Sequence, residues 1–488
     1  MQPKESTIAV LPGGAEEQLR RRHSALRHRL LTGHWQRDLE EHILQHFPLV
    51  RAAELGKPDM SRNLFATIIN QIAALYSSEP SVTNEDEGGA TAFMGVVDEA
   101  GLWQLAQRNQ RFQIGLRESI IRFALVGDEP RLQFRVVPVD QVYCLANPDE
   151  PDEPALYVEA RLRDMDGEKV WTWDYLDIRD PDDPKYKVLY PEDESTTIKD
   201  AIDVSERYLG GDFSGANYPY RYEDGTPFLP LALYHAERTG RLWDWGEKRS
   251  LVEGTLTVAT CFTFFLHVLK DSSWPQRYVV GAVLRGQTTR GSGFGAHSSV
   301  PADPASILQF TADGTGTPQL GQWQPGGNPE RLELALSSFE RNLAVHYGIS
   351  SSDLETNASQ AQSGYAISLR RSAIRETQRR YEPQNRRADL QLLSRAAAAC
   401  NRAGLGPFPE SEYRIRYEGL PRTPTELAAA REQALSDIRA GIATPVDLMI
   451  AKRPGITREQ AEASLAAIAE ERRRLAAFGI TSLGVDSP

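Results

Sequence analysis

The chain has little cysteine and no surplus of positive charge. Its three cysteines, Cys144, Cys261 and Cys400, lie far apart in 488 residues. An odd number at such spacing excludes a disulfide framework and fits a reducing compartment. The 55 lysines and arginines are outnumbered by 67 aspartates and glutamates, giving a formal net charge of −12. Proteins that grip nucleic acid tightly usually carry a basic surface, so the composition argues against a tight DNA-binding protein.

Several catalytic motifs are also missing. The sequence has no G-x-x-x-x-G-K-[ST], H-E-x-x-H, G-x-S-x-G or C-x-x-C pattern, which argues against a P-loop ATPase and against common hydrolase classes. The segment GSGFGAH at 291–297 neither follows a clear strand nor opens a helix, so we do not expect a dinucleotide site. The N-terminus lacks a charged head followed by an apolar run, and no signal peptide is expected. We therefore expect no enzyme and no cofactor, although a metal nuclease with scattered carboxylates stays open as the alternative.

The first elements are predicted to be helical. Apolar residues recur at three- and four-residue steps from Glu16 to Phe47. This stretch contains the basic run RRRHSALRHR, which we expect to be a solvated helix face, with nucleic acid or a partner as the alternative. His23 and His28 are five residues apart and therefore point to different faces, so no metal site is expected there. An amphipathic helix follows Pro58, with a stripe made of Leu64, Ile68, Ile72 and Leu75.

A further helix is predicted from Thr91 to about Phe123, after which the period changes to two. The segments RLQFRVVPVDQVYCLA, ALYVEARLRD, KVWTWDYLDI and YKVLY alternate apolar and polar residues and predict an antiparallel meander. Asp164–Gly167 (DMDG) is a hairpin turn signal. The acidic loop Asn147–Pro154 lacks the spacing of a calcium loop, so we expect a solvated turn rather than a cation site.

The second half begins with the most apolar segment, Leu251–Leu269, whose length nearly meets the membrane-spanning requirement of about 20 residues. Its Glu253, His267 and threonines argue against lipid, and neighbouring subunits could cover a helix apolar on nearly every side. A Gly-, Ser- and Thr-rich stretch with strand-like runs covers 271–327. A polar helix over 329–347, a polar loop, a long Arg-rich helix and a helical tail with a strand near 413–420 complete the chain.

Four stretches in this order resemble the portal proteins of tailed bacteriophages and their prophage relatives. They are NLFATIINQIAALYSSEP, FRVVPVDQVYCLANPDEPDEPALYVEARLR, HYGISSSDLETNASQAQSGYAISLRR, and the tail from YEGLPRTPTELAAAREQ to ASLAAIAEER. The resemblance covers most of the chain, and the order of the motifs is more specific than any one of them. It implies an α+β portal fold with an N-terminal arm (1–60), wing (61–245), first stem helix (246–270), clip (271–327), second stem helix (328–347), tunnel loop (348–364), long wing helix (365–405) and crown (406–488).

The resemblance also implies a function. Portal proteins form twelve-subunit rings at one capsid vertex, where double-stranded DNA passes during packaging and ejection. The implied partners are further copies of the chain, DNA, the large terminase subunit, a head-completion or adaptor protein, the major capsid protein and a scaffolding protein, with no membrane. The implied location is the virion, after assembly in the host cytoplasm.

Two residue sets are candidate sites. The tunnel loop offers small polar side chains to passing DNA, which would limit attraction to phosphate: Ser350, Ser351, Ser352, Thr356, Asn357, Ser359, Gln360 and Gln362. The long helix offers arginines for contacts between subunits: Arg370, Arg371, Arg375, Arg379, Arg380, Arg386 and Arg387. Pairing within their own helix and solvation are the alternative for these arginines.

Overall fold

The structure, a computed structural model, mixes α-helices with antiparallel sheets, so the predicted α+β class is confirmed. It describes residues 11–47, 57–127, 129–192, 196–246, 249–273, 276–280, 282–284, 310–312, 319–323, 328–347, 349, 364–418, 424–452 and 458–477. Two compact units are distinguished: Met1–Thr356 with Ala373–Leu420, and Asn357–Ser372 with Pro421–Pro488. The three cysteines are free.

The β-structure of the first unit consists mainly of two antiparallel sheets. The larger has the order β4-β5-β6-β7-β8, with β9 also paired to β7, and the smaller has the order β10-β2-β3. Their strands are β2 (Glu118–Val126), β3 (Arg131–Val137), β4 (Val142–Ala146), β5 (Pro154–Met165), β6 (Glu168–Asp177), β7 (Lys185–Tyr190), β8 (Ile202–Asp203), β9 (Phe213–Ser214) and β10 (Leu231–His235). The predicted meander is therefore confirmed, and the turn at Asp164–Gly167 joins β5 to β6.

The helices before the sheets are shorter than the periodicity predicts. The stretch from Glu16 splits into α2 (Ala15–Thr32) and α3 (Gln36–His46) at Gly33, whose φ of +82° ends α2. The predicted helix from Thr91 is likewise interrupted: α6 (Glu87–Glu99) and α7 (Leu102–Leu116) meet at Gly101, with φ +67°. The prediction that this helix reaches Phe123 is wrong, because Glu118 begins the buried strand β2.

The amphipathic helix after Pro58 is confirmed as α5 (Leu64–Ile72). The Asn63 side chain caps it by accepting a hydrogen bond from the backbone N–H of Ala66 at 3.0 Å. All members of the predicted stripe (Leu64, Ile68, Ile72 and Leu75) are buried. Through Leu64, Ile68 and Ile72, α5 joins a core shared with α2, α3 and the two helices described next.

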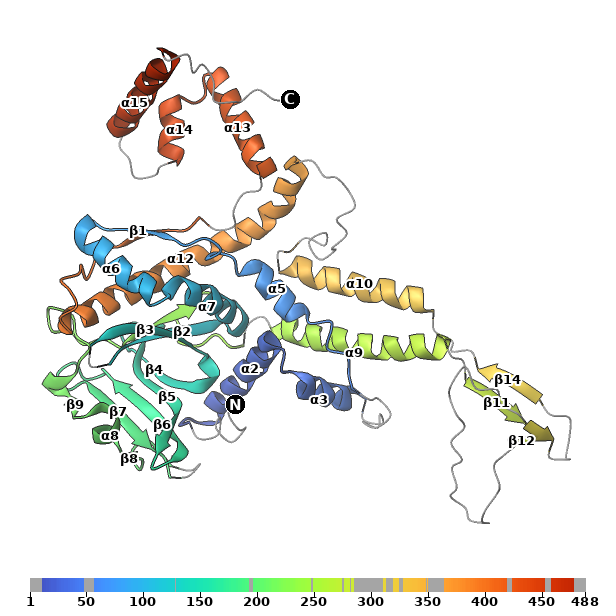
Figure 1. Cartoon of the computed structure of the whole chain (residues 1–488). Helices are drawn as coiled ribbons and strands as arrows, with labels where there is room; N and C mark the ends of the chain where they lie inside the picture. The colour runs from blue at the N-terminus through green and yellow to red at the C-terminus, as the bar shows by residue number, and fades with distance from the viewer. Residues whose placement is uncertain are drawn as a thin grey trace. The chain divides into compact units, whose positions relative to one another are not determined.

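The apolar segment forms α9 (Arg249–Ser273), which packs beside α10 (Pro329–His346) as a helical hairpin (Figure 1). Gly254 lets the helices approach closely, since a Cβ there would lie 2.8 Å from a methyl carbon of Leu343. In the segment of chain that connects the two helices, β11 (Gln276–Val280) pairs with β14 (Gln319–Trp323), and β12 (Ala282–Leu284) pairs with β13 (Phe310–Ala312). The segment 250–269 is long and apolar enough to cross a membrane, but half of its apolar 18-residue stretch is buried within the chain.

The long helix is α12 (Gly364–Arg402), close to the predicted bounds. From Ala388 to Cys400 its buried residues are mainly alanine and leucine, and they pack into the large core beside the sheets. Pro383 lies inside the helix and has no N–H to donate to the carbonyl of Arg379. Farther along, β15 (Arg414–Arg416) pairs with β1 (Ser81–Thr83).

The second unit contains three predicted tail helices, α13 (Pro424–Arg439), α14 (Pro445–Lys452) and α15 (Arg458–Ala477). Thr444 and Asp447 form a reciprocal cap at the start of α14, with the Asp447 carboxylate accepting from the Thr444 backbone at 2.9 Å.

Candidate functional site

Helix α10 carries apolar side chains that the described part of the chain leaves exposed. Leu334 is 69% exposed, Val345 58% and Phe339 45%. On the same helix, Ala344 is buried, and Leu336 and Leu343 pack against α9 and its neighbours. A helix with both buried and exposed apolar side chains usually has a second packing partner.

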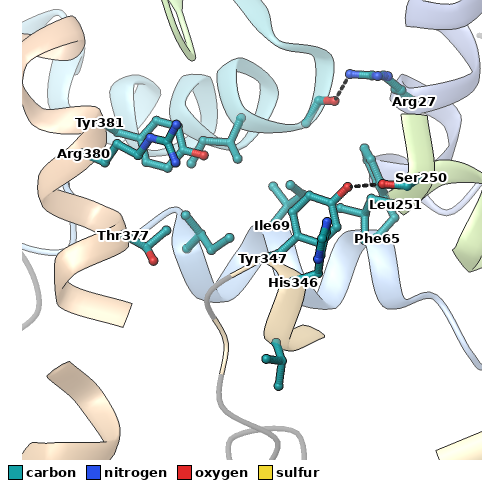
Figure 2. Close-up of a pocket in the computed structure, with 14 residues that line it drawn as sticks. Arg27, Phe65, Ile69, Ser250, Leu251, His346, Tyr347, Thr377, Arg380 and Tyr381 are labelled. Carbon is teal, nitrogen blue, oxygen red and sulfur yellow. Dashed lines mark hydrogen bonds between the residues drawn. The ribbon is translucent and has the colours of Figure 1, made fainter. Parts of the chain in front are cut away.

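A pocket of about 560 Å³ lies where this hairpin meets the rest of the first unit. Figure 2 shows Thr377, Arg380 and Tyr381 projecting from α12 on one side, with Ser250 of α9 and Tyr347 at the end of α10 on the other. The Ser250 and Tyr347 hydroxyls lie 2.8 Å apart. The remaining lining comes from α2, α5, α7, α9 and α10: Arg27, Phe65, Ile69, Ile72, Ile114, Gly115, Leu251, Val345 and His346.

An ion-pair cluster stands beside the pocket. Arg117 donates to Glu237 at 2.9 Å and to Asp244 at 2.8 Å, and Arg380 pairs with the other carboxylate oxygen of Glu237. Glu118 is fully buried, and burial raises its pKa to about 8 despite a 2.7 Å hydrogen bond from the Asp244 backbone and the charge of Arg117. The Glu118 carboxyl is therefore mostly protonated at neutral pH.

Arg27 forms part of the pocket wall although it belongs to the basic run of α2. Its guanidinium donates to the carbonyls of Gly115 and Trp245, both at 3.3 Å (the former drawn in Figure 2). Burial, followed by the nearby charge of Arg117, lowers the pKa of Arg27 to about 10. The arginine is thus held in a poorly solvated setting that already contains positive charge.

The rest of the basic run corrects the predicted solvated face. Arg20 and Arg21 are buried, as is Arg27. Arg20 pairs with Glu17 and donates to the carbonyls of Val139 and Val142 at 2.9 and 2.8 Å. The solvated-face prediction is wrong for these three arginines, because their guanidinium groups satisfy backbone carbonyls inside the first unit. His23 stacks on Trp245 and His28 lies 3.3 Å from Asp140, so the two histidines do face different neighbours.

The acidic turn between β4 and β5 is also more structural than predicted. Asp152 and Glu153 are each only 6% exposed. Asp152 pairs with Arg238, and its carbonyl lies 2.8 Å from Nε2 of His235. The expectation of a solvated turn is wrong for these two carboxylates, because side chains distant in sequence surround them.

A second buried network ties the two sheets together. Arg122 on β2 reaches Glu159 on β5 at 2.8 Å and Asp174 on β6 at 2.7 Å. Asp174 also pairs with Arg163 at 2.5 Å. Although burial opposes the charge of Asp174, the attraction of Arg122 and its neighbours holds the pKa of that carboxyl below its usual range. Arg135 adds a further pair to Glu159.

Asp389 on α12 contacts three tyrosine hydroxyls, an arrangement that was not predicted from the sequence. Its carboxylate accepts hydrogen bonds from the hydroxyls of Tyr234 at 2.6 Å, Tyr76 at 2.7 Å and Tyr417 at 2.5 Å. Burial raises the pKa of Asp389 to about 6, against the opposing effect of these donors. A lone acid just after Arg386 and Arg387 was the available signal, but its tyrosine partners lie far away in sequence.

The predicted site residues fall into two groups. The tunnel-loop residues Ser350, Ser351, Ser352, Thr356, Asn357, Ser359, Gln360 and Gln362 lie outside the described ranges. The side chains of Arg370 and Arg371 are likewise not described, although both belong to α12.

Three of the described arginines have partners in their own chain. Arg380 pairs with Glu237, Arg386 pairs with Glu382 one turn earlier, and Arg387 lies 3.6 Å from Glu150. Arg375 and Arg379 also lie on α12. A role for any of the set between subunits stays a prediction. Across the residues that the structure describes, no three His, Cys, Asp or Glu side chains are grouped as metal ligands would be.

Comparison with known proteins gives structural neighbours only, since no family model and no curated protein matches the sequence. A chain from the virion of a native gene transfer agent (GTA) particle is 12% identical with a TM-score of 0.38, covering 83% of this chain and 93% of that one. A chain from the neck of an empty GTA particle, computed with C6 symmetry, is 13% identical with a TM-score of 0.39, covering 79% and 88%. A chain from the neck of a native GTA particle, computed with C12 symmetry, is 12% identical with a TM-score of 0.39, covering 86% and 94%. These neighbours are virion and neck chains of a phage-like particle, and similarities this low carry no further conclusion.

Proposed function

We propose that this chain is the portal, or connector, subunit of a tailed bacteriophage or a related particle. It assembles into a ring, a dodecamer as in the family that its motifs resemble, at one vertex of a capsid. Double-stranded DNA passes through the ring during packaging and ejection. The ring is structural, and a separate large terminase subunit supplies the ATPase.

The observation that carries the proposal is the α9–α10 hairpin with its exposed apolar side chains. The two helices pack against each other, yet Leu334 and Phe339 on α10 lack cover from the described part of the chain. A second copy of the chain can supply this cover. If the copies are related by rotation, one face meets a different face of its neighbour, and the contacts close into a ring.

The order of the other elements supports the same proposal. Short antiparallel strand pairs separate α9 from α10, as a clip between two stem helices requires. We assign this excursion (271–327) to docking of the terminase and the head-completion or adaptor protein. The loop at 348–364, between α10 and α12, is proposed to face DNA in the channel, where its small polar side chains would make weak contacts.

Native mass spectrometry and negative-stain imaging of the purified chain test ring formation. The wild-type protein is expected to form rings with a central hole and a mass near twelve chains. The double variant Leu334→Glu with Phe339→Glu places charges at two exposed apolar positions of α10 and should yield folded monomers. Leu405→Glu, at an exposed leucine outside the hairpin, is the matched control and should leave the rings intact.

A wild-type protein that stays monomeric at micromolar concentration and moderate salt would refute the proposal. Rings formed equally well by the double variant would instead exclude these two positions from the subunit contact. Circular dichroism of the variants separates lost assembly from lost folding, because both substituted side chains are solvent-exposed in the single chain.

A further inference from the structure

The pocket at the base of the hairpin combines an apolar floor with a cationic wall. Phe65, Ile69 and Leu251 are buried and form part of the floor. Arg27 and Arg380 contribute positive charge to the wall (Figure 2). Among the described lining residues there is no aspartate or glutamate. The positive charge of this wall contrasts with the net charge of the chain, which is −12.

The two arginines of the wall are held by partners within the chain. Arg380 pairs with Glu237, which also pairs with Arg117, and Arg27 donates to the carbonyls of Gly115 and Trp245. A negatively charged ligand group would meet two guanidinium groups in the wall and no carboxylate among the described lining residues.

The polar atoms of the pocket can orient such a ligand. Ser250 and Tyr347 form a hydroxyl pair in which either oxygen can donate, so the pair can present a donor to a ligand. Arg380 has a guanidinium that is largely exposed at the pocket wall while it pairs with Glu237. The volume of about 560 Å³ falls in the range of small-ligand pockets, roughly 300–1,000 Å³.

We propose that this pocket binds a small amphiphilic monoanion. Its carboxylate or sulfonate head lies toward Arg380 and the Ser250–Tyr347 hydroxyl pair, and its aromatic or branched body lies on Phe65, Ile69 and Leu251. The described lining residues all belong to the first unit, and the proposal does not depend on the chain being a portal subunit.

A pair of fluorescent probes separates charge recognition from apolar adsorption. 1-Anilinonaphthalene-8-sulfonate is a monoanion with an aromatic body, and N-phenyl-1-naphthylamine is its neutral counterpart. The anionic probe is expected to bind the full chain saturably, one per chain, and at least about tenfold more tightly than the neutral probe. A tenfold difference is the effect of about 1.4 kcal/mol, the size of one charge-assisted contact.

Three variants locate the site. Arg380→Gln should weaken the anionic probe about tenfold and leave the neutral probe unchanged, since about 1.4 kcal/mol is tenfold. Thr377→Trp should fill the pocket and abolish saturable binding of both probes. Arg386→Gln is the matched control, because Arg386 lies on the same helix, pairs with Glu382 and does not line the pocket. Circular dichroism checks that each variant folds.

Several results would overturn the proposal. Equal affinity for the two probes would show that charge does not contribute to binding. An equal loss of affinity for the anionic probe in Arg380→Gln and Arg386→Gln would show the same for Arg380. Undiminished binding to Thr377→Trp would show that the probe binds another apolar surface, such as the one around Leu334 or Phe339 on α10. Binding to monomers that disappears on ring formation would show that a neighbouring copy, rather than a small anion, occupies the pocket.

Discussion

Replacing Asp389 with asparagine should remove a pH dependence of stability that this buried carboxyl creates. Burial raises the pKa of Asp389 from 3.8 to about 6 in the folded chain. Between these values the folded chain holds a proton that the unfolded chain has released. The free energy of unfolding therefore falls as the pH rises through this window. Each pKa unit corresponds to 1.36 kcal/mol, so the whole shift is worth roughly 3 kcal/mol, of which roughly 2.4 kcal/mol is lost between pH 4 and pH 7.

Asparagine keeps the shape of the side chain and one strong acceptor but does not titrate. The hydroxyls of Tyr76, Tyr234 and Tyr417 can reorient, with one of them accepting from the new amide. Alanine is a harsher change, because it leaves the three buried hydroxyls without this acceptor. We expect Asp389→Ala to cost about 3 kcal/mol or more at every pH, at about 1–3 kcal/mol for each unsatisfied group.

Urea unfolding followed by near-ultraviolet circular dichroism, at several pH values from 4 to 7, measures the effect as a difference between wild type and Asp389→Asn. Other carboxyls with shifted pKa values, such as Asp174, are present in both proteins and cancel in the difference. Asp98→Asn, at an exposed aspartate, is the control and should track the wild type. If the profiles of wild type and Asp389→Asn run parallel across this range, the inferred shift does not exist.

Two further outcomes are expected. Arg122→Ala leaves the buried carboxylates of Glu159 and Asp174 short of their shared partner, and it should lower the free energy of unfolding by about 3–5 kcal/mol in chemical denaturation; a loss near zero would show that the other arginines compensate. Replacing both Asn357 and Gln360 with arginine should preserve rings but slow DNA packaging, most of all at low salt, where the added attraction to phosphate is least screened; packaging at the wild-type rate at every salt concentration would place the 348–364 loop away from DNA.

Local patterns were predicted well wherever one face of an element is buried and the other is not. The stripe of Leu64, Ile68 and Ile72 identifies α5 because a helix places these residues on one side. The alternating segments identify β3 to β7 for the corresponding reason, with a period of two. The helix order after Leu251 was also predicted, since breaks of composition mark the ends of these helices. The structure adds that the Asn328 side chain caps α10.

The strand β2 was missed because it is buried on both faces. The first six residues of Glu118–Val126 are all buried, so the strand shows no alternation of apolar and polar positions. A short run of this kind cannot be distinguished from the end of a helix by periodicity. Gly101 is a separate signal: its positive φ marks the break between α6 and α7 and not the start of β2.

The charged interior and the pocket could not be predicted, because their partners are remote in sequence. Arg20 donates to the carbonyls of Val139 and Val142, more than a hundred residues away. The basic run around Arg20 therefore suggested a solvent-exposed side chain. The pocket draws its lining from several helices, including α2, α9 and α12. No local motif records that Arg27 and Arg380 face the same cavity.

The proline in α12 makes one point of this helix easier to bend than the rest. From Ala388 to Cys400 the helix is held in place, because many of its side chains are buried and Asp389 accepts hydrogen bonds from three tyrosines. Pro383 removes one backbone hydrogen bond just before this part, so the helix bends most easily there. A bend at Pro383 would change the position of Thr377, Arg380 and Tyr381, which line one side of the pocket, relative to the part of the helix that Asp389 anchors.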